Sequence, residues 1–298
     1  MQSTSNTRGP AVIKSVTNHS RQLFSEGFLI LDGLLPKSLI QKLNEELESV
    51  FANTDFCEGE FYGERTKRFG SLLRRSSISA DLVGHPEIIG IAETVLGHWC
   101  DTIQLNLSQA IEIYPGALPQ YPHRDQDMWR GPVGEIEYLV NVMWPLTAFT
   151  ERNGATLIWP GTHGQQAHFE VKDREPIVAE CEPGAAIVFL GSTLHGAGAN
   201  LTTRPRRGVI VSYCLGWLKP YENQWLAYPP EVARKFSPDL AGLVGYRQHR
   251  PNLGNYEGHC PSILLTERPP ARSRAVDALR PDQADAVRAF ADQLRTGK

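Results

Sequence analysis

Short β-prone runs separated by glycine or proline dominate the middle of this chain. Each run contains β-branched residues or alternates apolar with polar residues, and the runs lie at 102–113, 136–144, 155–159, 166–171, 176–180, 185–190 and 208–216. Many short strands joined by such turns are typical of an all-β sandwich or barrel. The sequence therefore predicts a β core between residues 102 and 216.

Helical periodicity appears on both sides of this region. Before it, one helix is predicted to begin near Pro36 and a second to run from Pro86 to Gly97. The first has an apolar stripe with a four-residue repeat, made of Leu39, Leu43, Leu47 and Phe51 and widened by Ile40 and Val50. After it, residues 275–296 look helical from about Pro281, with one apolar face made of Ala284, Val287, Phe290 and Leu294. The expected fold is mainly β with flanking helices.

Three segments show no periodicity. Residues 1–17 are polar and are expected to be flexible. Residues 55–77 are charged and dotted with glycine, which predicts a long loop, and residues 219–265 are predicted to form an ordered meander packed on the β core. Because a long loop inside a compact domain is more often functional than idle, both of these segments are candidate lids. Residues 18–298 are predicted to form a single domain.

Composition argues against several classes of partner. The count of 30 Lys+Arg against 33 Asp+Glu gives a net charge of -3, which argues against nucleic acid or an anionic membrane as the main partner. No apolar run approaches the roughly 20 residues that a membrane span needs, and residues 1–14 lack the apolar core of a signal peptide. Five scattered cysteines without a C-x-x-C pair indicate reduced thiols. We expect a soluble, cytoplasmic protein.

Two segments contain the residues of a candidate metal site. His123 and Asp125 are two residues apart, so on an extended segment their side chains point to the same face. His195 follows the run 185–190, 70 residues after Asp125. Two imidazoles and one carboxylate on one side of a metal are the facial triad of non-haem Fe(II) oxygenases. H-x-D alone is a weak signal, and its alternative explanation is a turn-capping histidine beside a solvated aspartate.

An arginine follows at a position that suits anion binding. Arg206 lies eleven residues after His195, where the last β-prone run begins. The planar fork of arginine binds a carboxylate through two parallel hydrogen bonds, so it suits the far end of a dicarboxylate cosubstrate such as 2-oxoglutarate. Arg207 remains the alternative, because strand alternation could turn either neighbour inward, and Arg204 is expected to be solvated.

The segments around these residues resemble a known family. HRD at 123–125, NGATLIWPGTH at 153–163 and EPGAAIVFLGSTLHGAGANLTTRPRR at 182–207 are similar to the phytanoyl-CoA dioxygenase (PhyH-like) family, and the likeness extends over roughly residues 22–260. The resemblance implies a double-stranded β-helix (jelly-roll, cupin-like) core that uses Fe(II), 2-oxoglutarate and O₂. It implies these site residues: His123, Asp125 and His195 as metal ligands, and Arg206, Gln120 and Thr156 as contacts of 2-oxoglutarate.

Two positions restrict the cosubstrate contacts and the type of reaction that the resemblance implies. Some members have a serine that contacts 2-oxoglutarate where this chain has Ala197, so that contact is absent. Halogenating relatives lack the carboxylate that Asp125 supplies here, so hydroxylation or another oxidation without halide is expected, with succinate and CO₂ as co-products. No CoA substrate is implied. The resemblance is compatible with a homodimer, which no sequence feature shows.

The substrate side is predicted from strand alternation, which places every second side chain on one face. If Arg206 faces inward, so does Ser212, and Asn141 and Met143 share a face of their own strand. In metabolite-tailoring relatives, positions such as Met143 and Ser212 line the substrate cavity; ordinary core packing is the alternative for the methionine. Trp129, in a loop near Gly-Pro, is either a lid of the pocket or simply buried.

The sequence thus predicts an Fe(II)/2-oxoglutarate dioxygenase that hydroxylates a C–H bond of a small, fairly apolar molecule, with natural-product biosynthesis as the expected setting. Desaturation, epoxidation or rearrangement with the same cofactors is the nearest alternative. A jelly-roll metal-binding protein without turnover is an alternative from another class, which loss of Asp125 or Arg206 would favour. A cupin-type zinc hydrolase is less well supported, because an inward arginine would have no task there.

Overall fold

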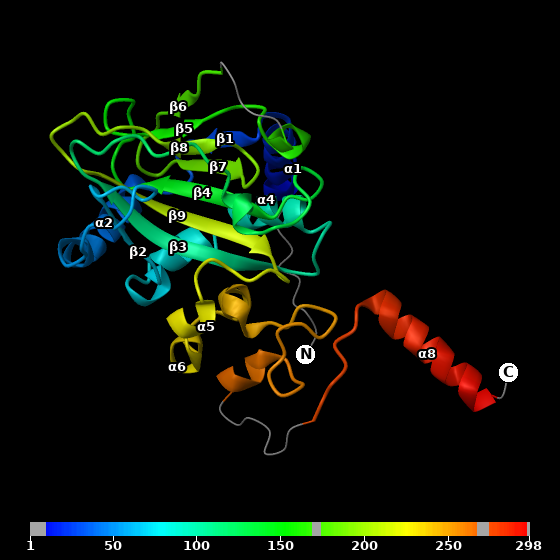
Figure 1. The fold of residues 1–298 in the computed structure, drawn as a ribbon. Coiled ribbons are helices and arrows are strands. Elements are labelled where there is room, and N and C mark those ends of the chain that lie inside the picture. The colour runs from blue at the N-terminus through cyan, green and yellow to red at the C-terminus, as the bar shows by residue number, and fades with distance from the viewer. Residues whose placement is uncertain (1–9, 169–173, 267–273, 297–298) are drawn as a thin grey trace.

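Two antiparallel sheets form the core of the computed structural model, which describes residues 10–168, 174–266 and 274–296 (Figure 1). Within these residues the larger sheet has the strand order β1-β7-β4-β9-β3-β2, and the smaller has the order β6-β5-β8. The strands are β1 (Phe28–Leu31), β2 (Thr66–Phe69), β3 (Ile103–Ile113), β4 (Leu139–Pro145), β5 (Thr156–Ile158), β6 (Ile177–Ala179), β7 (Ala186–Leu190), β8 (His195–Ala197) and β9 (Arg206–Leu215). This is the predicted jelly-roll core.

Helices cover the outer face of the larger sheet and extend the chain beyond it. The α-helices are α1 (Pro10–Glu26), α2 (Lys37–Ala52), α3 (Ser79–Val83), α4 (Pro86–Leu96), α5 (Gln224–Ala227), α6 (Pro230–Ala233), α7 (Pro238–Ala241) and α8 (Pro281–Thr296). Short 3₁₀ or π turns are η1 (Leu72–Arg74), η2 (Asp125–Met128), η3 (Gly164–His168), η4 (Gly242–Tyr246) and η5 (Pro261–Leu265). Helix α1 packs on α4, and α4 lies against β3, β4 and β9. No helix among the described residues is long and apolar enough to cross a membrane.

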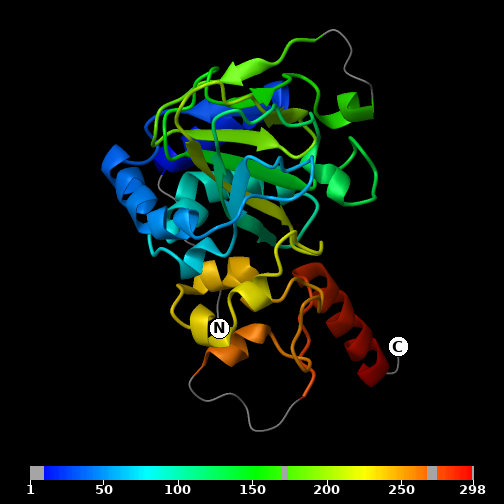
Figure 2. The same ribbon diagram turned by 60° about the vertical axis from the view of Figure 1, so that its left-hand side comes forward.

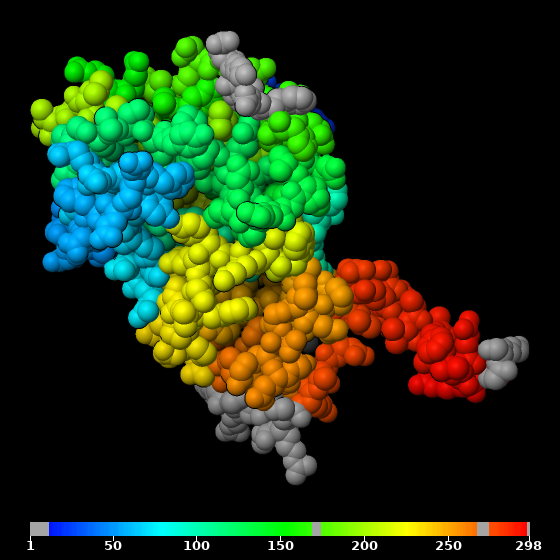
Figure 3. Space-filling model, viewed as in Figure 1, coloured from blue at the N-terminus to red at the C-terminus, as the bar shows by residue number. Residues whose placement is uncertain are grey.

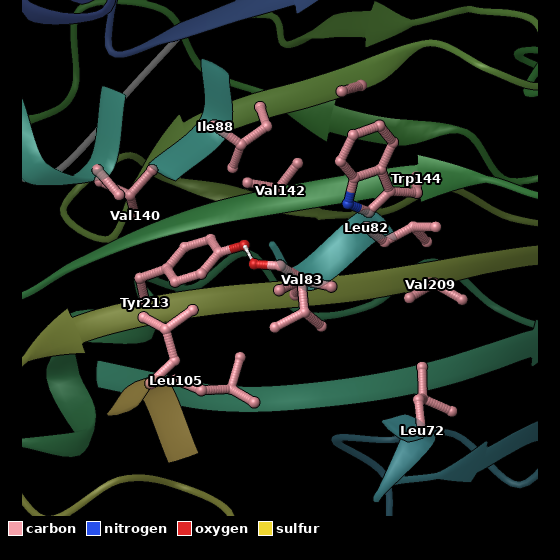
Figure 4. Close-up of a cluster of buried hydrophobic side chains, with 14 of the residues drawn as sticks. Leu72, Leu82, Val83, Ile88, Leu105, Val140, Val142, Trp144, Val209 and Tyr213 are labelled. Atoms are coloured by element: carbon pink, nitrogen blue, oxygen red, sulfur yellow. Dashed lines mark hydrogen bonds between the residues drawn. The ribbon is translucent and has the colours of Figure 1, made fainter. Parts of the chain in front are cut away.

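Strand alternation gives the larger sheet two different faces. Side chains of one parity pack against the helices in the main hydrophobic core, where Figure 4 shows Val140, Val142, Trp144, Val209 and Tyr213 facing Leu82, Val83 and Ile88. Side chains of the other parity face the smaller sheet and form a second buried cluster that includes Ile111, Met143, Ile187, Phe189 and Ile210. Because both faces are covered, β4 is buried along its entire length. The interior between the sheets is where the polar candidate residues lie.

A β-bulge in β3 changes which residues face the interior. The pairing with β9 shifts between Leu105 and Leu107, so that Leu105 joins the helix-side core whereas Leu107 packs with the interior cluster. The displaced residue, Asn106, is fully buried. Its side chain donates to Ser212 Oγ at 3.0 Å and accepts from the Tyr221 amide at 2.7 Å. The bulge therefore ties the strand to the segment that follows the β core.

The expectation of a flexible N-terminus is wrong for residues 10–17, which form the first half of α1. Val16 and Leu23 are buried on this helix, and its polar residues are also held. Ser15 Oγ donates to Glu87 Oε1 at 2.5 Å and His19 Nδ1 lies 2.6 Å from the same oxygen. Tertiary contacts with α4 thus order a segment whose composition is polar. Residues 1–9 lie outside the described residues.

Two further segments differ from their predicted structure. The predicted loop at 55–77 contains the edge strand β2, which pairs with β3, and the turn η1. Lys67 on β2 donates from its Nζ to the Phe51 carbonyl at 3.0 Å. A strand was predicted at 166–171, but residues 166–168 belong to the 3₁₀ turn η3. This turn begins at Gly164, whose amide donates to Ser192 Oγ. The rest of that prediction, at 169–171, lies outside the described residues.

The segment 219–265 packs as predicted beside the β core, but it contains the short helices α5, α6 and α7. Figures 1 and 2 both place it on one side of the core. Helix α8 forms at the predicted residues, yet none of its residues is buried. Its apolar face stays exposed at Val287, Phe290 and Leu294, and Figure 3 shows the helix (red) projecting from the body.

Replacing Tyr213 with Phe should lower the free energy of unfolding by about 1–2 kcal/mol, because it leaves the buried Val83 carbonyl without its donor. Tyr213 is fully buried and donates to that carbonyl at 2.7 Å (Figure 4). Urea unfolding monitored by circular dichroism measures the change, with Tyr256→Phe as the control because Tyr256 is 45% exposed. Equal unfolding free energies for the Tyr213 variant and the unmodified protein would contradict this packing.

Candidate active site

His123, Asp125 and His195 converge at the mouth of the interior. His123 precedes η2 and His195 begins β8, and the two residues exchange backbone hydrogen bonds of 2.9 and 3.0 Å. His123 Nε2 lies 3.4 Å from Asp125 Oδ1, and His195 Nε2 lies 3.6 Å from Asp125 Oδ2. One ligand atom from each of the three lies within 4.8 Å of the others, as binding to a single metal ion requires. The structure thus brings together the predicted triad.

Both imidazoles are oriented by backbone carbonyls. His123 Nδ1–H donates to the Tyr121 carbonyl at 2.9 Å, and His195 Nδ1–H donates to the Thr193 carbonyl at 3.1 Å. A hydrogen bond at Nδ1 fixes the tautomer and leaves Nε2 free to bind a metal. Both free nitrogens point toward the Asp125 carboxylate.

Electrostatics favours the metal-binding protonation states. Burial lowers the pKa of His195 although Asp125 opposes this, so the imidazole stays neutral. Burial alone would raise the pKa of Asp125, but His195, His123 and Arg68 outweigh it and the pKa is lowered. A neutral imidazole and an ionised carboxylate are the forms that bind a cation.

A cavity of about 380 Å³ opens from this triad into the space between the sheets. Its walls are largely apolar, and the apolar residues include Leu107, Ile111, Ile113, Met143, Phe189 and Ile210. A few polar groups converge on it from different strands, namely Arg68, Gln109, Gln120, Thr156 and Arg206. A mostly apolar cavity with a small number of polar groups is typical of a small-molecule site.

Arg206 points into this cavity and is 2% exposed. One guanidinium nitrogen donates to the carbonyl of Gly154, in a turn where the backbone of Gly154 has a φ of 87°. Its Nε has no hydrogen-bond partner among the described residues. Burial, together with Arg68, lowers the pKa of Arg206 to about 9. A buried cation with a free donor fits a ligand carboxylate, which would restore the missing partner.

Arg207 faces the other way. Its Nε donates to Glu112 Oε1 at 2.6 Å, and its terminal nitrogens bond to Glu48 of α2. Its guanidinium also lies over the ring of Phe51, 4.4 Å from the centroid. Of the two neighbours left open by the sequence, therefore, Arg206 faces the cavity and Arg207 joins the strand to the helices.

Gln120 and Thr156 also line the cavity. Thr156 is buried at the start of β5, opposite Ala197 of β8. Gln120 donates from its backbone to the Ala197 carbonyl at 2.9 Å and from its side chain to the Phe61 carbonyl at 3.3 Å. Both therefore share the cavity with the triad and Arg206.

Arg68 is a cavity residue that the sequence reasoning missed. It lies on the interior face of β2, paired in register with Ile111 of β3. Its terminal nitrogen donates to Gln109 Oε1 at 3.3 Å, while its Nε has no partner among the described residues. No periodic signal marks the four-residue strand β2 within its charged segment, so the inward direction of Arg68 could not be read from the sequence.

Residues of both predicted lid segments meet over the cavity. Phe61 packs edge-on against the His123 ring, with centroids 4.8 Å apart. The hydroxyl of Tyr62 contacts the hydroxyl of Tyr221, which lies 159 residues later in the chain. The guanidinium of Arg68 lies 5.0 Å from the centroid of the Tyr62 ring. These contacts place residues from 55–77 and 219–265 at the cavity mouth.

Comparisons with known proteins agree with this geometry. The family model described as "Phytanoyl-CoA dioxygenase (PhyH)" matches residues 24–208. The chain belongs to the phytanoyl-CoA dioxygenase family. Similar curated PhyH-family relatives include "Dioxygenase trt7" of Aspergillus terreus, 30% identical over 76% of this chain and 83% of the relative, and "Dioxygenase aneA" of Aspergillus aculeatus, 33% identical over 76% and 80%. The chain is therefore an enzyme of a dioxygenase family.

Solved structures share the fold of this PhyH-family chain. The non-heme alpha ketoglutarate dependent epimerase SnoN from nogalamycin biosynthesis has a TM-score of 0.57 at 17% identity, covering 68% of this chain and 84% of SnoN. HygX from Streptomyces hygroscopicus, solved with nickel, 2-oxoglutarate and hygromycin B, has a TM-score of 0.55 at 14% identity, covering 69% and 89%. SnoN has also been solved with Fe³⁺ and alpha ketoglutarate. In this chain, two histidines with one carboxylate suit a metal ion, and Arg206, whose Nε has no partner among the described residues, suits an anionic ligand.

The four residues predicted on the substrate side of this PhyH-family protein have different environments. Met143 lines the cavity. Asn141 and Ser212 are paired in register on the interior face, but both are fully buried and neither lines the cavity. Ser212 accepts the hydrogen bond from Asn106, whereas both amide atoms of Asn141 lack partners among the described residues. Ser212 is on the predicted interior face, where its hydroxyl is bonded to Asn106 of the β3 bulge, and its contact with substrate stays a prediction.

Trp129 does not line the cavity. Its indole nitrogen donates to the Lys219 carbonyl at 2.9 Å, and its ring lies 6.2 Å from that of Tyr138. It packs on the helix-side core. Of the two interpretations left open by the sequence, the structure supports packing, and Trp129 joins the loop after the triad to the segment 219–265.

A partly buried carboxylate, Glu137, contacts the turn that precedes His195. Glu137 accepts hydrogen bonds from the Ser192 amide at 2.9 Å and from Ser192 Oγ at 2.6 Å. Burial outweighs these bonds and raises the pKa of Glu137 from 4.5 to about 7. The folded state therefore retains a proton that the unfolded chain releases at lower pH.

Glu137 should make this protein less stable as the pH rises from about 4.5 to 7, since the unfolded chain then loses its proton first. The loss is at most about 3.5 kcal/mol, because the pKa rises from 4.5 to about 7 and each pKa unit corresponds to about 1.4 kcal/mol. Replacing Glu137 with Gln should remove this part of the pH dependence. Urea unfolding at several pH values measures it, and parallel stability curves for variant and unmodified protein would contradict the raised pKa.

Proposed function

We propose that this chain is an Fe(II)- and 2-oxoglutarate-dependent dioxygenase that hydroxylates a C–H bond of a small, fairly apolar molecule, with release of succinate and CO₂. One observation carries the proposal. A cluster of two imidazoles and a carboxylate shares a cavity with Arg206, a buried guanidinium that lacks a carboxylate partner among the described residues. A metal-binding keto acid with a second carboxylate would satisfy both ends of this arrangement.

The residues are suited to separate tasks. His123, Asp125 and His195 would hold iron on one face and leave the positions toward the cavity open. Arg206 would bind the far carboxylate of 2-oxoglutarate, with Thr156 and Gln120 along its length. Iron, when bound with 2-oxoglutarate and O₂, would supply the oxidising power for attack on an unactivated C–H bond, with O₂ as the oxidant and 2-oxoglutarate oxidised to succinate and CO₂. The chain's own contribution is to fix these groups and to orient the substrate.

Exclusion of water is a second contribution of the chain. Phe61, Tyr62 and Tyr221 cover the cavity mouth from two segments that are distant in sequence. Apolar side chains on three strands, Ile111, Phe189 and Ile210, line the interior beyond them. A dry site favours productive oxidation over side reactions with solvent. Because these walls offer mainly dispersion contacts, they support an apolar substrate.

Natural-product biosynthesis is the proposed setting. Curated relatives at 30–33% identity are fungal proteins named dioxygenases, and structures that share the fold were solved with nogalamycin RO or hygromycin B. Met143 is the proposed substrate contact among the residues predicted from the sequence, since it is the one of the four that lines the cavity. Desaturation, epoxidation or rearrangement would use the same site, and product analysis separates them from hydroxylation.

Two further points belong to the proposal. We propose that the protein works in the cytoplasm, which the five free cysteines support. We also propose a homodimer; the exposed apolar face of α8 offers area for contact with a second copy. Sedimentation equilibrium measures the mass directly, and a monomer at micromolar concentration would contradict the dimer.

Replacing His123, Asp125 or His195 with Ala should abolish the slow, substrate-free conversion of 2-oxoglutarate to succinate, since each change removes one of three metal ligands. The measurement is succinate formed in air with added Fe(II), by liquid chromatography and mass spectrometry. His98→Ala is the matched control, because His98 is exposed and distant in sequence from the triad. Succinate formation by the Asp125 variant at the unmodified rate would contradict the proposal, and so would an unmodified protein that forms none and binds no 2-oxoglutarate.

Arg206→Lys should raise the apparent KM for 2-oxoglutarate by about 30-fold or more, because losing a bidentate pair to a buried carboxylate costs about 2–5 kcal/mol. Arg207→Lys should leave this KM within about twofold, since Arg207 faces α2 and bonds to Glu48 and Glu112. Succinate formation as a function of 2-oxoglutarate concentration gives both values. The reverse pattern in the two variants would show that the arginine assignment is wrong.

A further inference from the structure

Glu137 and the fully buried Ser192 form a contact that does not line the cavity and that the proposed function does not use. We propose that Glu137 is a positioning residue for the metal site: by holding Ser192, it sets the distance between the segment that carries His123 and Asp125 and the turn that carries His195. This inference deepens the proposed function, because it concerns affinity for the same metal. Glu137 itself touches none of the three ligands.

Ser192 is a junction at which every polar group has a partner. Its amide and hydroxyl both donate to Glu137, at 2.9 and 2.6 Å. Its hydroxyl oxygen also accepts from the Gly164 amide at 3.0 Å. Its carbonyl accepts from Arg124 Nε at 2.9 Å. Ser192 is fully buried, so loss of any partner leaves a polar group without water to replace it.

One side of this junction leads to the H-x-D segment. Arg124 lies between His123 and Asp125 in the chain, and its guanidinium reaches across to Ser192 and, at 3.4 Å, to the Thr162 carbonyl. A displacement of Ser192 would therefore move the carbonyl that accepts from Arg124, the residue between His123 and Asp125.

The other side leads to His195. The residue after Ser192 is Thr193, whose carbonyl accepts from His195 Nδ1 and so sets the direction of the imidazole. Thr193 is held in turn by its hydroxyl, which donates to the Gly27 carbonyl at 2.8 Å. Leu194 donates to Thr162 Oγ1 at 3.0 Å. The turn that orients His195 is thus fixed at successive residues, and Glu137 fixes its first part.

Stability alone does not explain a carboxylate at this position. The influences on Glu137 are burial and hydrogen bonds from Ser192 and Gly191, with no cation among them. A buried carboxylate without a cationic partner costs free energy. What a carboxylate offers over an amide is two acceptor oxygens, which match the two donors of Ser192. In glutamine an NH₂ group replaces one of these two oxygens and faces a donor of Ser192, so the substitution disturbs the contact while keeping the size of the side chain.

Glu137→Gln should raise the Kd for Fe(II) about 10-fold, the lower end of the range for outer partners of metal ligands. The metal-free variant should unfold at a temperature close to that of the unmodified protein at pH 8, because removal of the Glu137 charge offsets the loss of one hydrogen bond from Ser192. Anaerobic equilibrium dialysis and thermal circular dichroism measure the two. Glu135→Gln is the matched control, since Glu135 is two residues away and exposed. A Kd within twofold of the unmodified value would overturn the proposal.

Ser192→Ala provides a second variant that tests the same contact. The Glu137 and Ser192 substitutions should be non-additive, so that the double variant binds Fe(II) about as weakly as the weaker single variant. Fully additive losses would overturn the proposal, because they would show that the two residues act independently.

A readout without metal separates this inference from the proposed function. In metal-free protein labelled with ¹⁵N-histidine, the His195 Nδ1–H signal should shift and exchange faster with solvent in Glu137→Gln, and should not change in Glu135→Gln. Failure of the unmodified protein to bind Fe(II) would contradict the proposed function. An unchanged His195 signal in Glu137→Gln would contradict the positioning role whether or not iron binds.

Discussion

The reciprocal backbone hydrogen bonds between His123 and His195 are the contact on which the rest of the site depends. They join the segment after β3 to β8 across 72 residues of sequence and fix the separation of the two imidazoles, whose centroids are 4.4 Å apart. Because both residues are fixed by backbone pairing, the ligand geometry follows from the jelly roll itself. The orientation of each imidazole is then set by a hydrogen bond to a backbone carbonyl, that of Tyr121 for His123 and that of Thr193 for His195.

Because the larger sheet has two faces, neighbouring residues of one strand can have different roles. Arg206 and Arg207 are adjacent, yet the first is buried in the cavity and the second pairs with acidic groups on the helix side. The helices cover the outer face of the larger sheet with apolar side chains and a few ion pairs. The interior, which has its own smaller apolar cluster, also holds a cavity and Arg206, whose Nε has no partner among the described residues. The rest of the core offsets the cost of both.

Much of this arrangement could be predicted from sequence, for identifiable reasons. The β runs and the helices at Pro36, Pro86 and Pro281 have strong periodicity and clear boundaries. The metal triad could be predicted because H-x-D on an extended segment puts both side chains on one face, and because the surrounding segments resemble a known family. In contrast, β2 is too short to show a period, and Arg68 on it was missed.

Other differences arise from contacts distant in sequence. Alternation gave the correct face for Ser212 but not its exposure, because the bulge at Asn106 belongs to a different strand. The N-terminal helix is stabilised by contacts with α4 that its polar composition does not suggest. Glu137 has no motif at all, and its position beside Ser192 depends on how η3, β4 and the turn after β7 meet. Local propensity cannot supply such tertiary information.

The central claim is that one ligand joins the triad to Arg206, and anaerobic optical titration tests it most directly. Adding 2-oxoglutarate to protein loaded with Fe(II) should produce a weak visible charge-transfer band that saturates at one equivalent, since the keto acid then chelates iron. The band should be absent without Fe(II). Tight binding of 2-oxoglutarate without any such band would contradict the account, because the cosubstrate would then lie away from the metal.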